Sequence, residues 1–421
     1  MYSFYKIKTE LVVNLLHPLT TLESISLSDE EKNFIGTHIN ANVQQLILGH
    51  NAVNALNIRK MAVQISARQR LCDKLPAWVA NPDIIFPSTV PTEQSSSEKT
   101  ARYKARIVSN FRPVSAQLLD LTGGMGVDTW ALASVADRVT YVERDSELAG
   151  LAAHNLPRLG LPNVTVLNAQ SDTVLANFDP PADWIYLDPA RRDDRGGRIV
   201  RLDDCEPNVV AWWPTLMANT TNLLLKASPL IDIEATLRAL PGILAVYVVA
   251  VQHEVKEVLF IAGKDPVSTD DVQVIAIDLT TTGEVEFRFR RGDERTVPVG
   301  FDTPRAFIYE PNAAIMKAGA FRVIGHRFGL TKLAPHSHLY TSDEQIAHFP
   351  GRMFRLEAIC KPSRADLQQF VPGMKANLTV RNFPQSVDDL RKKLGLKEGG
   401  DVYILATTLQ NGDKRLLVTR K

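Results

Sequence analysis

The chain is poor in cysteine and in long apolar segments. Its 421 residues include three cysteines, Cys72, Cys205 and Cys360, which form neither a metal-binding spacing nor an even disulfide set. We therefore expect a reducing compartment and no bound metal. The longest apolar run, residues 242–251, is far shorter than a membrane span. These absences predict a cytoplasmic protein with no membrane partner.

The chain also lacks an excess of charge of either sign. Its 48 Lys and Arg against 47 Asp and Glu give a formal net charge of +1, so any nucleic-acid partner has to be met by local patches. Two segments are locally basic. One is the helical pattern of residues 58–75, and the other runs from Lys375 to the end, where ten basic residues face five acidic ones. Each is either a solvated surface or an RNA contact.

The most informative stretch is residues 118–133. An apolar run ending in Asp120 predicts a buried strand, and a turn with Gly123, Gly124 and Gly126 follows it before a helical pattern begins. A strand, a glycine turn and a helix form the ligand-binding corner of a doubly wound α/β sheet. The helix start supplies free N–H groups for a carboxylate or a phosphate.

The spacing of the glycines in this turn limits the classes of ligand that it can bind. A dinucleotide pattern needs a third glycine, but Thr129 occupies that place. The next predicted strand, residues 139–143, ends in Glu143, where a carboxylate can take both ribose hydroxyls. Together with the later Asp-Pro-Ala-Arg at residues 188–191, these features favour S-adenosylmethionine (SAM) over a nicotinamide cofactor or a ligand-free domain.

A second motif, residues 184–192, ends the predicted fourth strand beside the expected methyl group. Asp188 could hold the SAM amine or an acceptor N–H or O–H, and could accept a proton. Arg191 and Arg192 begin a set of five arginines within residues 191–201. These arginines form either a phosphate-binding rim over the active site or a salt-bridged loop.

The same region restricts the acceptor atom. The positions after Pro189 hold no aromatic residue to stack on a base, and the next predicted strand ends without a cysteine nucleophile. Cys205 lies in a loop before a helix and is interpreted as structural. Pyrimidine C5 chemistry is therefore disfavoured. Lys226, at the end of that next strand, either faces the site or is structural.

Two further segments are candidates for cofactor contacts. After the predicted third strand, Gln170 occupies the place of an adenine-binding acid, with Asp172 as the alternative. Residues 87–99 are either a linker or a loop that closes over SAM, where Ser95 and Ser96 would hydrogen-bond the methionine end.

The periodicity predicts four regions. Residues 1–88 form a helical domain, and residues 89–263 alternate strands and helices as in a mostly parallel sheet. Residues 264–335 form a small α+β module that begins with a hairpin near 272–290, and residues 336–421 form another.

Five motifs together resemble a bacterial family of class I SAM-dependent methyltransferases. They are Ser-Ser-Ser-Glu at 95–98, Asp-Leu-Thr-Gly-Gly-Met-Gly-Val-Asp at 120–128, Leu-Asp-Pro-Ala-Arg-Arg at 187–192, Asp-Cys-Glu-Pro at 204–207 and Glu-Pro-Asn-Ala-Ala-Ile at 310–315. The resemblance implies a Rossmann-like seven-stranded α/β sheet, a helical N-terminal region, a ferredoxin-like insert and a C-terminal THUMP-like domain. It also implies RNA as the substrate, because THUMP domains present RNA to the catalytic domains to which they are attached.

The resulting hypothesis is a SAM-dependent methyltransferase of structured RNA, rRNA or tRNA, that works by direct SN2 transfer. A protein or small-molecule methyltransferase and a non-catalytic RNA-binding protein are the alternatives. The predicted catalytic residues are Asp188, Arg191 and Arg192. The predicted cofactor residues are Ser95, Ser96, Asp120, Thr122, Gly123, Gly124, Met125, Gly126, Glu143, Arg144, Gln170 and Ser171.

Overall fold

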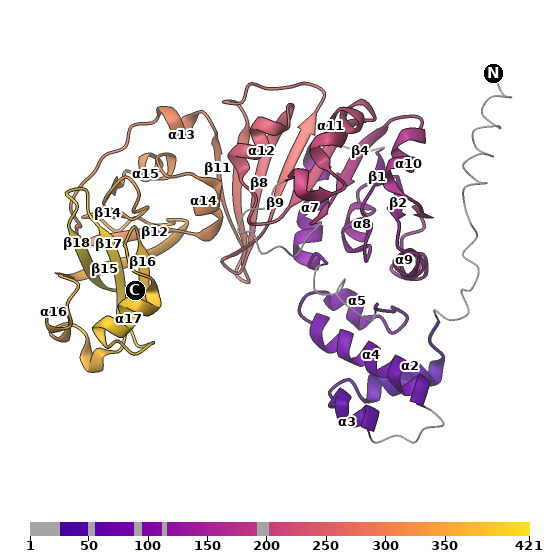
Figure 1. The fold of residues 1–421 in the computed structure, drawn as a ribbon, viewed down its shortest axis with the longest axis horizontal. Coiled ribbons are helices and arrows are strands. Elements are labelled where there is room, and N and C mark those ends of the chain that lie inside the picture. Colours follow the sequence, from indigo (N-terminus) through magenta and orange to yellow (C-terminus); the bar gives the residue numbers. More distant parts are fainter. Residues whose placement is uncertain (1–25, 49–54, 88–94, 112–115, 192–201) are drawn as a thin grey trace. The chain divides into compact units, whose positions relative to one another are not determined.

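The computed structural model describes residues 26–48, 55–87, 95–111, 116–191 and 202–421 (Figure 1). The chain divides into two compact units. The first unit comprises residues 1–242 and 260–265, and the second comprises residues 243–259 and 266–421. Among the described residues, no helix combines the length and the apolar character needed to cross a membrane.

The first unit begins with helices that pack around a small apolar core. They are α2 (Asp29–Thr37), α3 (Val43–Leu48), α4 (Ala55–Leu71), α5 (Pro76–Ala80) and α7 (Glu98–Phe111). Helix α2 starts directly after Ser28, because Ser28 and Glu31 form a reciprocal capping box. Ile35 of α2 packs with Ile58 and Ile65 of α4 in one buried cluster.

One residue of the basic face expected on residues 58–75, Arg68, is buried in the interior. Arg68 is 4% exposed, and its guanidinium donates to the backbone oxygens of Val79, Asn81, Pro82 and Ile84. Val79 lies in α5 and the other three carbonyls follow it, so Arg68 ties the end of that helix and the chain after it to α4. It cannot belong to a solvated or RNA-facing surface.

The large sheet has nine strands in the order β11-β10-β8-β9-β7-β4-β1-β2-β3. Strands β1 (Gln117–Asp120), β2 (Arg138–Glu143), β3 (Val164–Asn168), β4 (Ala182–Leu187) and β7 (Thr220–Ala227) lie in the first unit, where each neighbouring pair is parallel. Helices α8 (Val127–Leu132), α9 (Ser146–Arg158), α10 (Ser171–Asn177), α11 (Val209–Ala218) and α12 (Ile233–Ala239) alternate with these strands. This is the Rossmann-like α/β arrangement that the alternation of patterns predicted.

The sheet is wider than the seven strands expected. The hairpin β10 (Gln273–Leu279) and β11 (Glu284–Arg290) was assigned to a module of residues 264–335. Instead, β10 pairs in parallel with β8 (Ile243–Val251) along its whole length, from Gln273 opposite Ala245 to Leu279 opposite Val251. Six of its seven residues are buried, because both of its edges and both of its faces are covered. Strand β9 (Glu254–Gly263) follows β8 in the chain.

The second unit contains a seven-stranded sheet in the order β13-β14-β12-β15-β18-β17-β16. Its strands are β12 (Phe307–Pro311), β13 (Thr331–Lys332), β14 (Tyr340–Ser342), β15 (Gly351–Cys360), β16 (Asn377–Arg381), β17 (Tyr403–Thr408) and β18 (Lys414–Arg420). Strands β17 and β18 form the C-terminal hairpin, and α17 (Val387–Leu394) is a helix with three basic residues in its last turn. The domain limit drawn at residue 335 falls between β13 and β14, which pair with each other.

The motif of residues 310–315 ends β12 and starts α14 (Ala313–Ala318). Asn312 caps this helix by accepting from the amide of Ile315, and Gly319 closes it in the left-handed conformation. Glu310 is 2% exposed and pairs with Arg352 and Arg381, which are both about 40% exposed. This buried carboxylate therefore links β12 to β15 and β16.

Candidate cofactor and active site

The loop between β1 and α8 requires glycine at three positions. Gly124 and Gly126 have φ of 52° and 81°, which a residue with a Cβ adopts at a cost. A Cβ on Gly123 would lie 2.1 Å from the Tyr141 ring, so no side chain fits there. The Tyr141 hydroxyl donates to the Gly124 oxygen at 2.6 Å and fixes the loop over β2.

Asp120 supports this loop from below. It is 1% exposed and accepts from the Thr122 amide at 2.9 Å and from the Thr129 hydroxyl at 2.5 Å. Burial raises its pKa to about 7, although both hydrogen bonds act in the opposite direction. Asp120 was predicted to line the cofactor pocket, but this buried carboxyl does not line the cavity described below. The same holds for Gly126, which starts α8.

Glu143, at the end of β2, reaches across to the glycine loop. One carboxylate oxygen accepts from the Gly124 amide and the other from the Asp145 amide, both at 2.9 Å. Each carboxylate oxygen has a second lone pair. The side chain is therefore held in one orientation and keeps acceptor capacity for two neighbouring hydroxyls.

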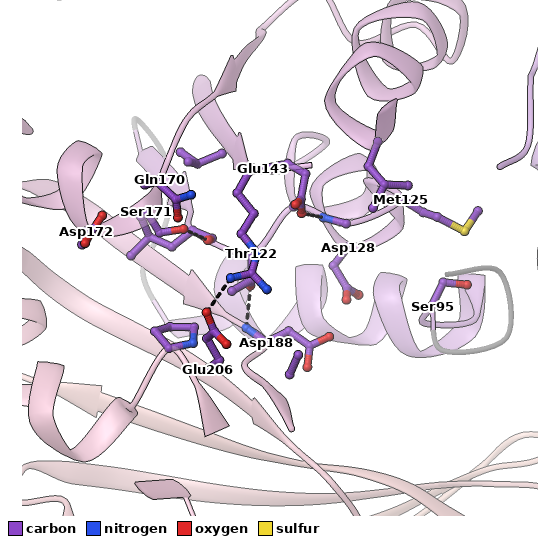
Figure 2. A pocket seen from close by; sticks show the side chains of 18 of the residues that line it. Ser95, Thr122, Met125, Asp128, Glu143, Gln170, Ser171, Asp172, Asp188 and Glu206 are labelled. Carbon is purple, nitrogen blue, oxygen red and sulfur yellow. Dashed lines mark hydrogen bonds and ion pairs between the residues drawn. The ribbon is translucent and has the colours of Figure 1, made fainter. Parts of the chain in front are cut away.

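These elements surround a cavity of about 540 Å³, within the range of small-molecule sites (Figure 2). The cavity lies at the carboxyl ends of β1, β2 and β4, where ligands bind in open α/β sheets. The predicted residues that line it are Ser95, Ser96, Thr122, Gly123, Gly124, Met125, Glu143, Arg144, Gln170, Ser171 and Asp188. Eleven residues far apart in the sequence thus meet around one space.

The wall after β3 contains Gln170, Ser171 and Asp172 (Figure 2). The Ser171 hydroxyl donates to the Leu121 oxygen at 2.6 Å, which ties the start of α10 to the end of β1. Gln170 is the N-cap residue of α10 but its side chain makes no capping bond. Gln170 and Asp172 both line the cavity, so each stays available as the partner of an amine.

A carboxylate that the sequence did not single out, Asp128 of α8, forms a buried charge cluster at the same cavity. Its Oδ2 accepts from the hydroxyls of Ser96 and Tyr186, both at 2.7 Å, and its Oδ1 lies 3.1 Å from the Nζ of Lys104. Burial opposes ionisation of Asp128, but Lys104, Lys226 and the two hydroxyls outweigh it and lower its pKa to about 2. Asp128 is therefore an ionised group at the cavity wall.

Lys104 is fully buried within α7. It follows the apolar spacing of that helix together with Ala101, Ala105 and Val108, so a lysine occupies a core position. That position in an otherwise amphipathic pattern is the signal from which this cluster could have been found. A buried lysine requires a partner, and Asp128 is that partner.

Asp188 lies at the edge of the cavity, just beyond β4. Its backbone amide donates to the Thr122 hydroxyl at 2.7 Å (Figure 2). Its Oδ2 accepts from the Nζ of Lys226 at 2.6 Å. Lys226, near the end of β7, thus faces the site, which was one of its two interpretations. The Asp188 side chain is 36% exposed, so a substrate can reach it.

The remaining wall comes from residues 205–212. Arg144 pairs with Glu206 at 2.5 Å, and Pro207, Asn208 and Trp212 also line the cavity. Trp212 was not predicted, although it supplies the aromatic surface that is missing after Pro189. Trp212 comes from α11, whereas the motif of residues 184–192 belongs to the end of β4.

The predicted arginine rim lies largely outside the described residues, and Arg192 belongs to that part. The backbone of Arg191 pairs with Cys205 in a short antiparallel ladder, β5 (Ala190–Arg191) with β6 (Cys205–Glu206). Cys205 is 3% exposed. Within the described ranges, no three His, Cys, Asp or Glu side chains are grouped so that they could hold a metal ion.

The chain is similar along nearly its whole length to a proposed methyltransferase from Porphyromonas gingivalis W83. The crystal structure of that protein is 34% identical, covers 93% of this chain and 97% of its own, and superposes with a TM-score of 0.83. The chain belongs to this family of SAM-dependent methyltransferases. Family models match a ferredoxin-like domain at residues 307–350 and a THUMP-like domain at residues 351–421.

Two further relatives extend the comparison. An uncharacterized S-adenosylmethionine-dependent methyltransferase of Mycobacterium tuberculosis is 25% identical over 76% of this chain and 84% of its own length. The ribosomal RNA small subunit methyltransferase J of Serratia proteamaculans is 36% identical over 106 residues, which are 23% of this chain and 42% of that protein. The cofactor of this enzyme is SAM, as the resemblance implied.

Proposed function

We propose that this methyltransferase acts on a nitrogen or oxygen of structured RNA, either rRNA or tRNA. The observation that carries the proposal is the 106-residue similarity to a methyltransferase named for small-subunit ribosomal RNA. The THUMP-like match at residues 351–421 supports it. That domain also holds the segment in which ten basic residues outnumber five acidic ones from Lys375 onward, which suits a phosphate backbone.

The cavity suits SAM because two glycines, Gly123 and Gly124, line it and let a ligand approach the backbone closely. Gly123 has no room for a Cβ. We assign the ribose hydroxyls to Glu143, and the adenine amine to Gln170 or Asp172. The methionine end then lies near Ser95 and Ser96, where the ionised Asp128 can balance its ammonium group.

The chemistry requires little from the chain beyond alignment and a place for one proton. When bound, SAM would supply a methyl group on a sulfonium sulfur; an acceptor nitrogen or oxygen would form the new bond to this methyl as the C–S bond breaks, with S-adenosylhomocysteine as leaving group and loss of a proton from the acceptor. Asp188 lies at the cavity edge with its backbone fixed by Thr122, so its carboxylate can orient the acceptor N–H or O–H. Being 36% exposed, it can pass the proton to water. Arg191 and Arg192 would then border the acceptor and contact its phosphates.

The test is transfer of labelled methyl from SAM to total cellular RNA by the purified full-length protein. Wild type is expected to label RNA, and Glu143→Ala is expected to lose both labelling and SAM binding in calorimetry. Glu147→Gln, an exposed acid in the first turn of α9, is the matched control and should behave as wild type. Wild type that binds SAM and labels no RNA would overturn the RNA assignment.

A further inference from the structure

Lys226 occupies an unusual position between two carboxylates at the wall of the cavity. Its Nζ lies 2.6 Å from the Oδ2 of Asp188 and 3.8 Å from the Oδ2 of Asp128. Only 12% of its side chain is exposed, against 36% for Asp188. The lysine therefore approaches the cavity from the protein interior and meets Asp188 from behind.

Lys226 is not the nearest cation of Asp128. That carboxylate already faces Lys104 at 3.1 Å and accepts from the hydroxyls of Ser96 and Tyr186. Lys226 is 1.2 Å closer to Asp188 than to Asp128, from the difference between 3.8 and 2.6 Å. Its main partner is therefore the residue at the substrate side.

Asp188 is then held at two points. Thr122 accepts from its backbone amide at 2.7 Å, and Lys226 donates to one of its two carboxylate oxygens. A side chain fixed at both ends loses rotamer freedom before the substrate arrives, which lowers the entropic cost of aligning an acceptor. Because Lys226 donates to Oδ2, Oδ1 is the oxygen that can accept a hydrogen bond from an acceptor N–H or O–H.

We propose that Lys226 is a positioning residue that orients the Asp188 carboxylate toward the acceptor. This rests on the proposed role of Asp188 in the function above. Asp128 lies on the interior side of Lys226, 3.8 Å from its Nζ, and Lys104 in turn pairs with Asp128 at 3.1 Å. The chain Lys104, Asp128, Lys226, Asp188 alternates in sign from the buried interior to the cavity.

The experiment compares Lys226→Met and Lys226→Arg with wild type in the full-length protein. Crystal structures of each, grown without SAM, are expected to show the Asp188 carboxylate displaced in the Met variant and in place in the Arg variant. Single-turnover transfer from labelled SAM to total RNA should fall about 10- to 100-fold for Met, with partial recovery for Arg. SAM affinity should stay within about threefold, because Lys226 is behind Asp188.

Lys264→Met, an exposed lysine that follows β9, is the matched control and should match wild type in every readout. An Asp188 carboxylate that keeps its position in the folded Met variant overturns the proposal, whether or not RNA is labelled. So does a transfer rate of the Met variant that equals that of wild type. If wild type labels no RNA, the RNA assignment fails while the crystal structures still decide the role of Lys226.

Discussion

Asp128 in the first unit and Glu310 in the second unit are buried carboxylates that each face two cations. The cations of Asp128 are lysines with 0% and 12% exposed side chains, whereas those of Glu310 are arginines that are about 40% exposed. Asp128 borders the cavity and reaches Asp188 through Lys226. Glu310 joins the segment of residues 307–350 to that of residues 351–421.

The balance of charges alone therefore does not identify a functional site. Both clusters combine one buried acid with two bases, and both satisfy the requirement that a buried charge be paired. What separates them is the surroundings: one cluster shares its cation with a carboxylate that substrate can reach, and the other spans three strands of a sheet. The four predictions below test whether this separation holds.

The largest effect is expected from removing the acid of each cluster. Asp128→Asn leaves the fully buried Lys104 without its carboxylate partner and should lower the free energy of unfolding of the first unit by about 3–5 kcal/mol. Glu310→Gln should cost less, about 1–3 kcal/mol, because its arginines can turn toward water. All five tryptophans, residues 78, 130, 184, 212 and 213, lie in the first unit, so their fluorescence in denaturant follows that unit.

The same two variants separate function from stability. Asp128→Asn should weaken SAM binding, while Glu310→Gln should leave SAM affinity unchanged and speed hydrogen exchange only in peptides from residues 307–421. A Glu310→Gln variant that loses SAM affinity would show that the two clusters are not independent.

The second prediction uses pH and a third buried acid, Asp120. Its pKa is raised to about 7, so the stability it contributes is present below about pH 4 and is lost as pH rises through about 7. Asp128, with a pKa of about 2, contributes stability above about pH 4 that is lost as pH falls through about 2. Asp120→Asn should therefore remove a decline of a few kcal/mol between pH 4 and 7, measured by tryptophan fluorescence. An unchanged slope would mean that Asp120 is ionised throughout.

The third prediction removes one cation from each cluster. Lys104→Met leaves Asp128 with only its more distant lysine and should destabilise the first unit by about 2–3 kcal/mol. Arg381→Met leaves Arg352 on Glu310 and should cost the second unit about 1 kcal/mol. Hydrogen exchange measured during thermal unfolding distinguishes the two units. Equal losses of unfolding free energy in the two variants would contradict the argument that the more deeply buried cation contributes more.

The smallest effect is expected for an ion pair at the rim of the cavity. Arg144 and Glu206 have side chains that are 56% and 46% exposed, so Arg144→Gln should change the free energy of unfolding by about 0.5 kcal/mol or less. High salt should abolish even that difference. A loss above about 2 kcal/mol would show that this pair is protected from water.

Features with local causes could be predicted from the sequence. The strand, glycine turn and helix of residues 118–133, the cap of α2, the bounds of α17 and the β17–β18 hairpin follow from spacing and turn chemistry within short windows. Glu143 was found because it ends a strand at a set distance from the glycine turn. The partner of its carboxylate, the Gly124 amide, follows from the same geometry.

Features that depend on distant residues could not be predicted in this way. Asp128, Lys104 and Lys226 come from three elements and meet only when α7 and α8 pack beside the sheet. The β10–β11 hairpin has the alternation of an independent module, and only its pairing with β8 assigns it to the large sheet. Arg68 lies in a basic pattern typical of a surface, yet four backbone oxygens hold it inside.

The contact between Gly123 and Tyr141 limits how this enzyme can change over generations. A Cβ at position 123 would overlap the tyrosine ring at 2.1 Å, while the tyrosine hydroxyl holds the neighbouring residue of the loop. Neither residue can be replaced alone without damage to the loop. A larger residue at 123 would overlap the Tyr141 ring, and a smaller residue at 141 would remove the hydrogen bond to the Gly124 oxygen. We expect related chains to keep both residues or to replace both together, so that the pair is inherited as a unit.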